Sequence, residues 1–130
     1  MMASMPELAV WKEKVVEEAR SLGYAESVMG RRRHLPHLNS DDRMLRSHAE
    51  RQAINHHIQN PAAEITLRAM VLMQDFVTLV GQRYDSVIFE SDNKEAGNMA
   101  KEVMKSVRPD WLTVPLEVEA SSGPNWGDMK

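Results

Sequence analysis

Two stretches decide the fold of this chain: GYAESVMGRRRHLPHLN (residues 23–39) and ERQAINHHIQNPAAEI (residues 50–65). The first stretch places three consecutive arginines, residues 31–33, directly after a glycine, which is a residue typical of tight turns. In the second stretch Arg51, Asn55 and Gln59 recur every four residues. That spacing aligns side chains along one face of a helix. The pattern therefore predicts an arginine turn followed by a helix with one polar face.

Outward from these stretches, the periodicity of apolar residues predicts the other elements. Apolar residues at three- and four-residue steps indicate helices, and alternating ones indicate strands. We expect a helix over 7–22, a hairpin of 24–28 with 32–35 around Met29-Gly30, and a helix from Asn39 or Ser40 to about residue 57. Asn60-Pro61 would cap and open a separate helix. YDSVIFES (84–91), a helix over 94–107 and a last strand in VPLEVEA (114–120) complete the series.

These elements predict one α+β unit over residues 1–130, with four main helices packed on a small antiparallel sheet. We expect residues 1–60 to hold the first helices and the arginine turn. Residues 61–130 would hold a hairpin, a helix and the last strand. In that hairpin Asp85 is expected at the turn.

The composition is typical of a globular domain, with 42% apolar and 27% charged residues. No apolar run is long enough to span a membrane, so no membrane partner is expected. The start of the chain does not resemble a signal peptide. Cysteine is absent, which excludes disulfides and thiolate metal sites without fixing a compartment. The cytoplasm is the default expectation.

The charge is unevenly distributed, although the net charge is only −3. Residues 30–68 carry seven arginines and four acids, whereas the flanking segments are acidic. Arginine suits bidentate contacts to phosphate, and a local basic patch matters more for nucleic-acid binding than the overall charge. The alternative is an ordinary solvated surface.

The histidines raise the question of a structural metal. His34 and His37 are three residues apart, and His56 and His57 are adjacent. Zinc needs three or four ligands that converge. Pro36 separates the first pair, and neighbours on a helix point in different directions, so the spacing does not favour a zinc site.

The chain resembles family A (bacterial polymerase I-like) DNA polymerases from about Pro6 to Trp126. The resemblance is carried by the G-R-R turn after a G-Y strand, by ERQAINHHIQ, by YDSVIFE and by the late GPNW. ERQAINHHIQ is similar to the family's E-R-x-A-I-N-x-x-x-Q, although Asn60-Pro61 stand where the family has Gly-Thr. The resemblance implies a C-terminal palm and fingers segment, of a split or phage-type enzyme acting in the cytoplasm, or the host cytoplasm if phage-encoded. It implies contacts to primer–template DNA from six residues: Arg31, Arg32, Arg51, Asn55, Gln59 and Tyr84.

The same resemblance gives Asp85 a catalytic and metal-binding role. The family has His-Asp-Glu where this chain has Tyr84-Asp85-Ser86. The family's aspartate is one of two carboxylates that hold Mg²⁺ for phosphoryl transfer. The resemblance thus implies Mg²⁺ at Asp85, shared with a carboxylate that this chain does not contain.

Two family motifs are missing from the sequence. D-Y-S-x-I-E-L-R supplies the second aspartate, and R-x-x-x-K-x-x-x-F-G-x-x-Y-G holds the incoming nucleotide. We therefore expect a DNA-directed DNA polymerase fragment that is inactive alone and incomplete without a partner, an N-terminal polymerase chain carrying both motifs. The alternative is a non-catalytic DNA-binding remnant or accessory module.

Overall fold

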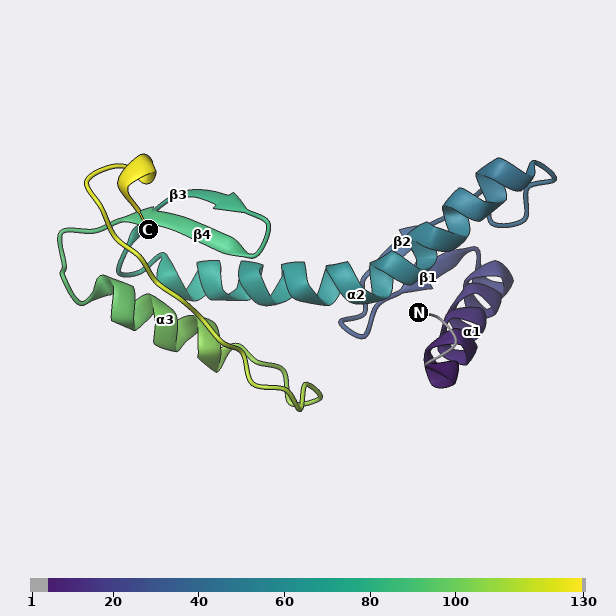
Figure 1. The fold of residues 1–130 in the computed structure, drawn as a ribbon, viewed down its shortest axis with the longest axis horizontal. Helices are drawn as coiled ribbons and strands as arrows, with labels where there is room; N and C mark the ends of the chain where they lie inside the picture. Colours follow the sequence, from purple (N-terminus) through teal and green to yellow (C-terminus); the bar gives the residue numbers. More distant parts are fainter. Residues whose placement is uncertain (1–4, 130) are drawn as a thin grey trace. The chain divides into compact units, whose positions relative to one another are not determined.

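The computed structural model describes residues 5–129, which form two compact units divided between Ala62 and Ala63. The long helix α2 (Arg43–Met73) contributes residues to both units (Figure 1).

The first unit begins with helix α1 (Pro6–Leu22), which agrees closely with the predicted helix. Proline suits the first turn of a helix because the missing N–H would have no partner there. Gly23 ends the helix with φ +78°, and its N–H donates to the carbonyl of Ala19. Strands β1 (Tyr24–Glu26) and β2 (Arg32–His34) then form the predicted antiparallel hairpin, with Ala25 opposite Arg33.

The core of the first unit is built mainly from small side chains. α1 contributes Val15 and Ala19, and α2 contributes Ala49 and Ala53. Leu38, only 1% exposed, is the largest fully buried residue here. Ala25 and Leu35 complete the cluster, so the hairpin and the segment after it are packed against both helices.

Helix α2 begins later than predicted. The carboxylate of Asp42 accepts hydrogen bonds from the N–H groups of Met44 (2.7 Å) and Leu45 (3.4 Å). Asp42 is therefore the N-cap, and the predicted caps Asn39 and Ser40 lie outside the helix. Ser40 Oγ instead accepts the N–H of Asp42.

The prediction of a separate helix opened by Asn60-Pro61 was wrong. α2 continues through Pro61, so residues 5–129 contain three α-helices and not four. A cap at Asn60 would need its side-chain oxygen to accept an N–H of the next turn. In the structure that oxygen accepts a hydrogen bond from Ser27 Oγ at 2.6 Å, so the Asn60 side chain is directed to the loop after β1.

The second unit contains strands β3 (Thr78–Arg83) and β4 (Ser86–Glu90), helix α3 (Ala96–Ser106) and the short 3₁₀ helix η2 (Trp126–Asp128). β3 and β4 are antiparallel, with an irregularity between Leu79 and Gly81. Ala69 and Met73 of α2 pack with Val77 and with Ala96 and Ala100 of α3. Partly buried residues from the hairpin and α3 surround this cluster: Phe76, Leu79, Val87, Phe89, Val103, Met104 and Val107.

The predicted last strand over 114–120 was also wrong. Within residues 5–129, the two sheets consist of β1–β2 and β3–β4 only. Val114 is 62% exposed, and Pro115 has no N–H to donate to a ladder. The α+β class is correct, and both predicted hairpins form, each as its own two-stranded sheet.

No helix in the described part of the chain combines the length and the apolar character needed to cross a membrane.

Candidate nucleic-acid interface

The predicted polar row, Arg51, Asn55 and Gln59, lies on α2 in the first unit, and all three residues are exposed. The spacing explains the arrangement, because residues four apart in a helix occupy one face. Ala49 and Ala53, which belong to a different face, are buried in the core. The row can therefore reach a partner while the helix remains packed.

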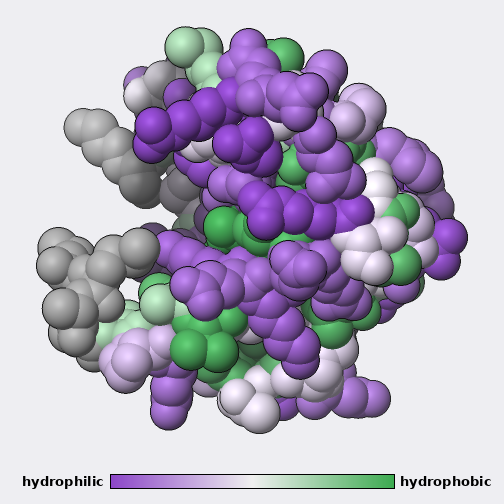
Figure 2. All heavy atoms as spheres, turned by 90° about the vertical axis from the view of Figure 1, so that its right-hand side faces the viewer, coloured by the Kyte–Doolittle hydropathy of each residue, from purple (hydrophilic) through white to green (hydrophobic). Residues whose placement is uncertain are grey.

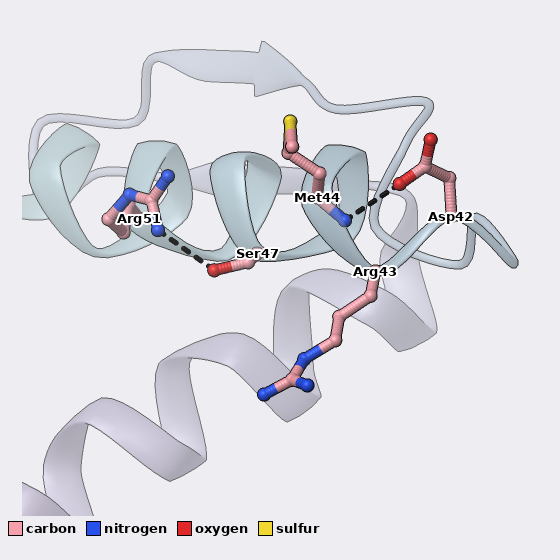
Figure 3. Close-up of a pocket in the computed structure, with 5 residues that line it drawn as sticks. All are labelled: Asp42, Arg43, Met44, Ser47 and Arg51. Carbon is pink, nitrogen blue, oxygen red and sulfur yellow. Dashed lines mark hydrogen bonds between the residues drawn. The ribbon is translucent and has the colours of Figure 1, made fainter.

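Arg51 is held along the helix surface. Its Nη1 donates a hydrogen bond to Ser47 Oγ at 2.8 Å. Figure 3 shows Arg51 lying against Ser47 while Arg43 projects away from the helix. These residues, with Asp42 and Met44, line a hollow of about 460 Å³ at the start of α2. Met44 is 80% exposed there, so the hollow is part of the surface and not of the core.

The arginine turn, residues 27–33, comprises the loop between β1 and β2 and the first two residues of β2, and hydrogen bonds close the loop. Gly30 N–H donates to the Ser27 carbonyl at 2.8 Å, and Ser27 N–H donates to the Arg31 carbonyl at 2.9 Å. Gly30 has φ +81°, a conformation that glycine adopts without steric cost. Arg31, Arg32 and Arg33 are all exposed.

Arg32 has local partners within the hairpin. Its Nε forms an ion pair with Glu26, which lies opposite in the strand register, and its guanidinium lies 4.7 Å from the centre of the Tyr24 ring. The hydrogen bond to Glu26, followed by the charges of Tyr24 and Glu26, raises the pKa of Arg32. Arg32 is thus oriented by its neighbours before any partner binds.

Two side-chain hydrogen bonds join the arginine turn to α2, and the sequence reasoning missed both. His56 Nε2 lies 2.8 Å from the carbonyl oxygen of Arg31, and Ser27 Oγ donates to Asn60 Oδ1. The sequence did contain a signal for His56. It follows Ala49 and Ala53 at the spacing of the buried stripe, which indicates a histidine facing the protein and not a metal.

Tyr84 and Asp85 form the turn between β3 and β4 in the second unit, as predicted for Asp85. Tyr84 has φ +54° and is 84% exposed. Its carbonyl accepts Gln82 Nε2 at 3.2 Å, and Ser86 Oγ donates to the Arg83 carbonyl at 2.8 Å. Asp85 is exposed, so its carboxylate is open to solvent and to a partner.

The predicted site residues thus fall into two groups. Arg31, Arg32 and the polar row lie in the first unit, whereas Tyr84 and Asp85 lie in the second. Hydrophilic side chains cover most of the face that Figure 2 shows. Among residues 5–129, no three His, Cys, Asp or Glu side chains gather as a metal-binding group.

Comparison with known proteins places the chain among polymerases. The model of the family described as "DNA polymerase family A" matches residues 1–128. The thermostable DNA polymerase I of Thermus aquaticus is 38% identical over 135 residues, covering 98% of this chain and 16% of that protein. DNA polymerase I of Bacillus subtilis is 39% identical over 130 residues, covering 92% of this chain and 14% of that protein.

A solved structure shows the same fold. It is the POL domain of Pol1 from M. smegmatis, in complex with DNA primer-template and dNTP. The TM-score is 0.81 at 35% identity, and the match covers 91% of this chain and 22% of that chain. The chain therefore spans a small part of the length of its relatives.

Proposed function

The chain belongs to DNA polymerase family A, and on that premise we propose that it forms the C-terminal palm and fingers segment of a DNA-directed DNA polymerase. The observation that carries the proposal is the exposed row Arg51, Asn55 and Gln59 beside the arginine turn, within one unit. We expect it to act in the cytoplasm.

The polar row would contact the minor groove of the primer–template duplex. Every base pair presents N3 or O2 acceptors in that groove, and the side chains of arginine, asparagine and glutamine can all donate to them. Contacts to such shared acceptors test the shape of a base pair and not its identity. A copying enzyme needs this property.

The arginine turn would contact the DNA backbone. Guanidinium groups bind phosphate through two parallel hydrogen bonds. Arg32 is already oriented by Glu26 and Tyr24, which reduces the conformational freedom that it loses on binding. We assign Arg31 the same role.

Asp85 would contribute one carboxylate to a Mg²⁺ site, with Tyr84 beside it at the primer end. Mg²⁺ prefers oxygen ligands, and an exposed carboxylate on a turn suits it. Bound there, Mg²⁺ supplies charge that stabilises the attacking and leaving oxygens of phosphoryl transfer. Asp85 itself holds the ion, and Tyr84 orients the primer end.

The remaining parts of the site would come from the rest of the polymerase domain. We propose that the second aspartate and the nucleotide-binding helix are supplied by an N-terminal polymerase segment, either in a longer polypeptide or as a separate chain. A non-catalytic DNA-binding role is the second candidate. It is favoured by Ser86, which stands where the family's pattern has a carboxylate.

The proposal is tested by the affinity of the chain for a primer–template duplex, measured by fluorescence anisotropy on two unrelated sequences. We expect equal affinities for both sequences, and a loss of about tenfold for Arg51→Ala. Lys14→Ala is the matched control, because it removes one positive charge from an exposed position on α1. Equal losses for the two variants would contradict the proposal.

A further inference from the structure

We propose that His56 is a positioning residue that fixes the arginine turn for DNA binding, an inference that rests on the proposed function. His56 lies on α2 and is only 8% exposed, so it is poorly placed to contact DNA itself. Its ring Nε2 lies 2.8 Å from the carbonyl oxygen of Arg31. His56 therefore acts on the backbone of the turn.

The chemistry of this contact determines the state of the histidine. A carbonyl oxygen only accepts, so Nε2 of His56 must carry the hydrogen. The same carbonyl also accepts the N–H of Ser27 at 2.9 Å. A carbonyl oxygen has two lone pairs, and both are used here. The carbonyl group of Arg31 is thus held both by Ser27, the residue after β1, and by His56 of α2.

A second hydrogen bond supports the first. Ser27, which is 4% exposed, donates through Oγ to Asn60 at 2.6 Å and accepts the N–H of Met29 at 3.3 Å. His56 and Asn60 are four residues apart, about one helical turn, so both bonds reach the same side of α2.

The two anchoring residues have a fixed relation to the polar row. His56 directly follows Asn55, and Asn60 directly follows Gln59. Consecutive residues are about 100° apart round a helix, so the anchored side and the polar row are neighbouring sides of α2. The hydrogen bonds therefore set the position of the arginine turn relative to the row. A turn that is ordered beforehand loses less conformational freedom when DNA binds.

The test uses the 130-residue chain and a primer–template duplex, with affinity measured by fluorescence anisotropy. His56→Leu keeps a similar volume but removes the donor, and we expect affinity to fall by about fivefold to tenfold. His56→Gln retains an N–H donor and is expected to recover affinity to within about twofold of the wild type. In a chain that already carries Arg31→Ala and Arg32→Ala, His56→Leu should change affinity by less than about twofold.

The matched control is His57→Leu. His57 is the next residue on α2, is partly buried, and packs edge-on against Trp11 with ring centres 6.2 Å apart. This variant tests whether replacing any histidine on this helix weakens DNA binding, and we expect the affinity to change by less than about twofold. Should His56→Leu fail to fold, Ser27→Ala removes the second anchor and is expected to weaken binding by about threefold.

The outcomes separate this inference from the proposed function. If Arg51→Ala weakens duplex binding but His56→Leu and His57→Leu reduce the affinity equally, the inference about His56 is overturned and the proposed function stands. An effect of His56→Leu that persists fully without the two arginines would also overturn the inference, as would unchanged binding by Ser27→Ala. A wild-type chain that does not bind the duplex would overturn the proposed function, and the inference with it.

Discussion

The two turns that carry the candidate site residues are built in different ways. The arginine turn has a glycine at its positive φ, and His56 and Ser27 anchor it to α2 through hydrogen bonds that span 25 and 33 residues of sequence. The Tyr84-Asp85 turn places a tyrosine at positive φ, and its hydrogen bonds join residues within 82–86. The arginine turn is therefore held by α2, whereas these bonds of the Tyr84-Asp85 turn lie between near neighbours in sequence.

This difference indicates that the two turns have different roles. A turn that is ordered before its partner arrives suits binding, because less freedom is lost on association. An exposed carboxylate on a locally held turn suits a site that is completed by groups from elsewhere. We infer that this chain contributes DNA affinity through its first unit and one metal ligand through its second.

The largest expected effect concerns Asp85. In the polymerase domain assembled with the missing motifs, Asp85→Ala should reduce the rate of primer extension by at least about a thousandfold, because a Mg²⁺ ligand acts on the transition state. DNA affinity should change by less than about twofold, since affinity comes mainly from phosphate and groove contacts. Single-turnover extension and duplex binding measure the two quantities. Ser86→Ala serves as the control, and near wild-type extension by Asp85→Ala would refute the assignment.

The next effect concerns the core beneath the arginine turn. Leu38 is 1% exposed, and Leu38→Ala should lower the free energy of unfolding by about 3 kcal/mol through lost burial and a cavity. The matched variant is Leu72→Ala in the second unit, where the leucine is 51% exposed and the cost should stay below about 0.5 kcal/mol. Urea unfolding followed by circular dichroism gives both values. Similar losses of unfolding free energy for the two variants would contradict the assignment of Leu38 to the core of the first unit.

Smaller changes in stability are expected from substitutions at the two positive-φ residues, Gly30 and Tyr84. Gly30→Ala should destabilise by about 1 kcal/mol, because a side chain disfavours φ +81° even though nothing lies within 4 Å of the added Cβ. Tyr84→Gly should be neutral or stabilise by up to about 1 kcal/mol, because glycine relieves the strain at φ +54°. Thermal unfolding of the two variants provides the measurement. A stabilising Gly30→Ala would show that the arginine turn does not need its glycine.

The smallest effect is a pH dependence in the first unit. Burial beside Trp11, and then the charge of His56, lowers the pKa of His57, while Glu18 opposes the shift. The folded state therefore takes up a proton less readily than the unfolded state. The His57 contribution to stability is complete above the ordinary pKa of 6.5 and declines as the pH falls below it. His57→Gln should reduce the loss of stability between about pH 7.5 and 5.5, and an unchanged pH dependence would count against this reading.

Local patterns predicted the elements whose causes are local. The apolar stripe and Gly23 gave α1 and its end, and Gly30 marked the hairpin. The four-residue spacing of the polar row predicted its exposed face on α2. These features depend on neighbours in sequence.

One failure was local, since the cap of α2 is Asp42 and not Asn39 or Ser40. The other failures depend on residues that are distant in sequence. Asn60-Pro61 has the form of a helix start, but α2 continues through Pro61, and the Asn60 side chain bonds to Ser27, 33 residues away. The last strand has the right alternation but no partner among residues 5–129. His56 could not be assigned to Arg31 before the hairpin was placed against α2. The sequence therefore predicted the exposure of the site residues well, but it did not predict the hydrogen bonds that hold them.

We propose that the polar row and the arginine turn form the DNA-contacting face. The most direct test follows the side-chain and backbone NMR signals of the isotope-labelled chain during titration with a primer–template duplex. We expect the signals of Arg31, Arg32, Arg51, Asn55 and Gln59 to shift, while those of Lys14 on α1 stay in place. Shifts concentrated on α1, with the polar row unchanged, would contradict this proposal.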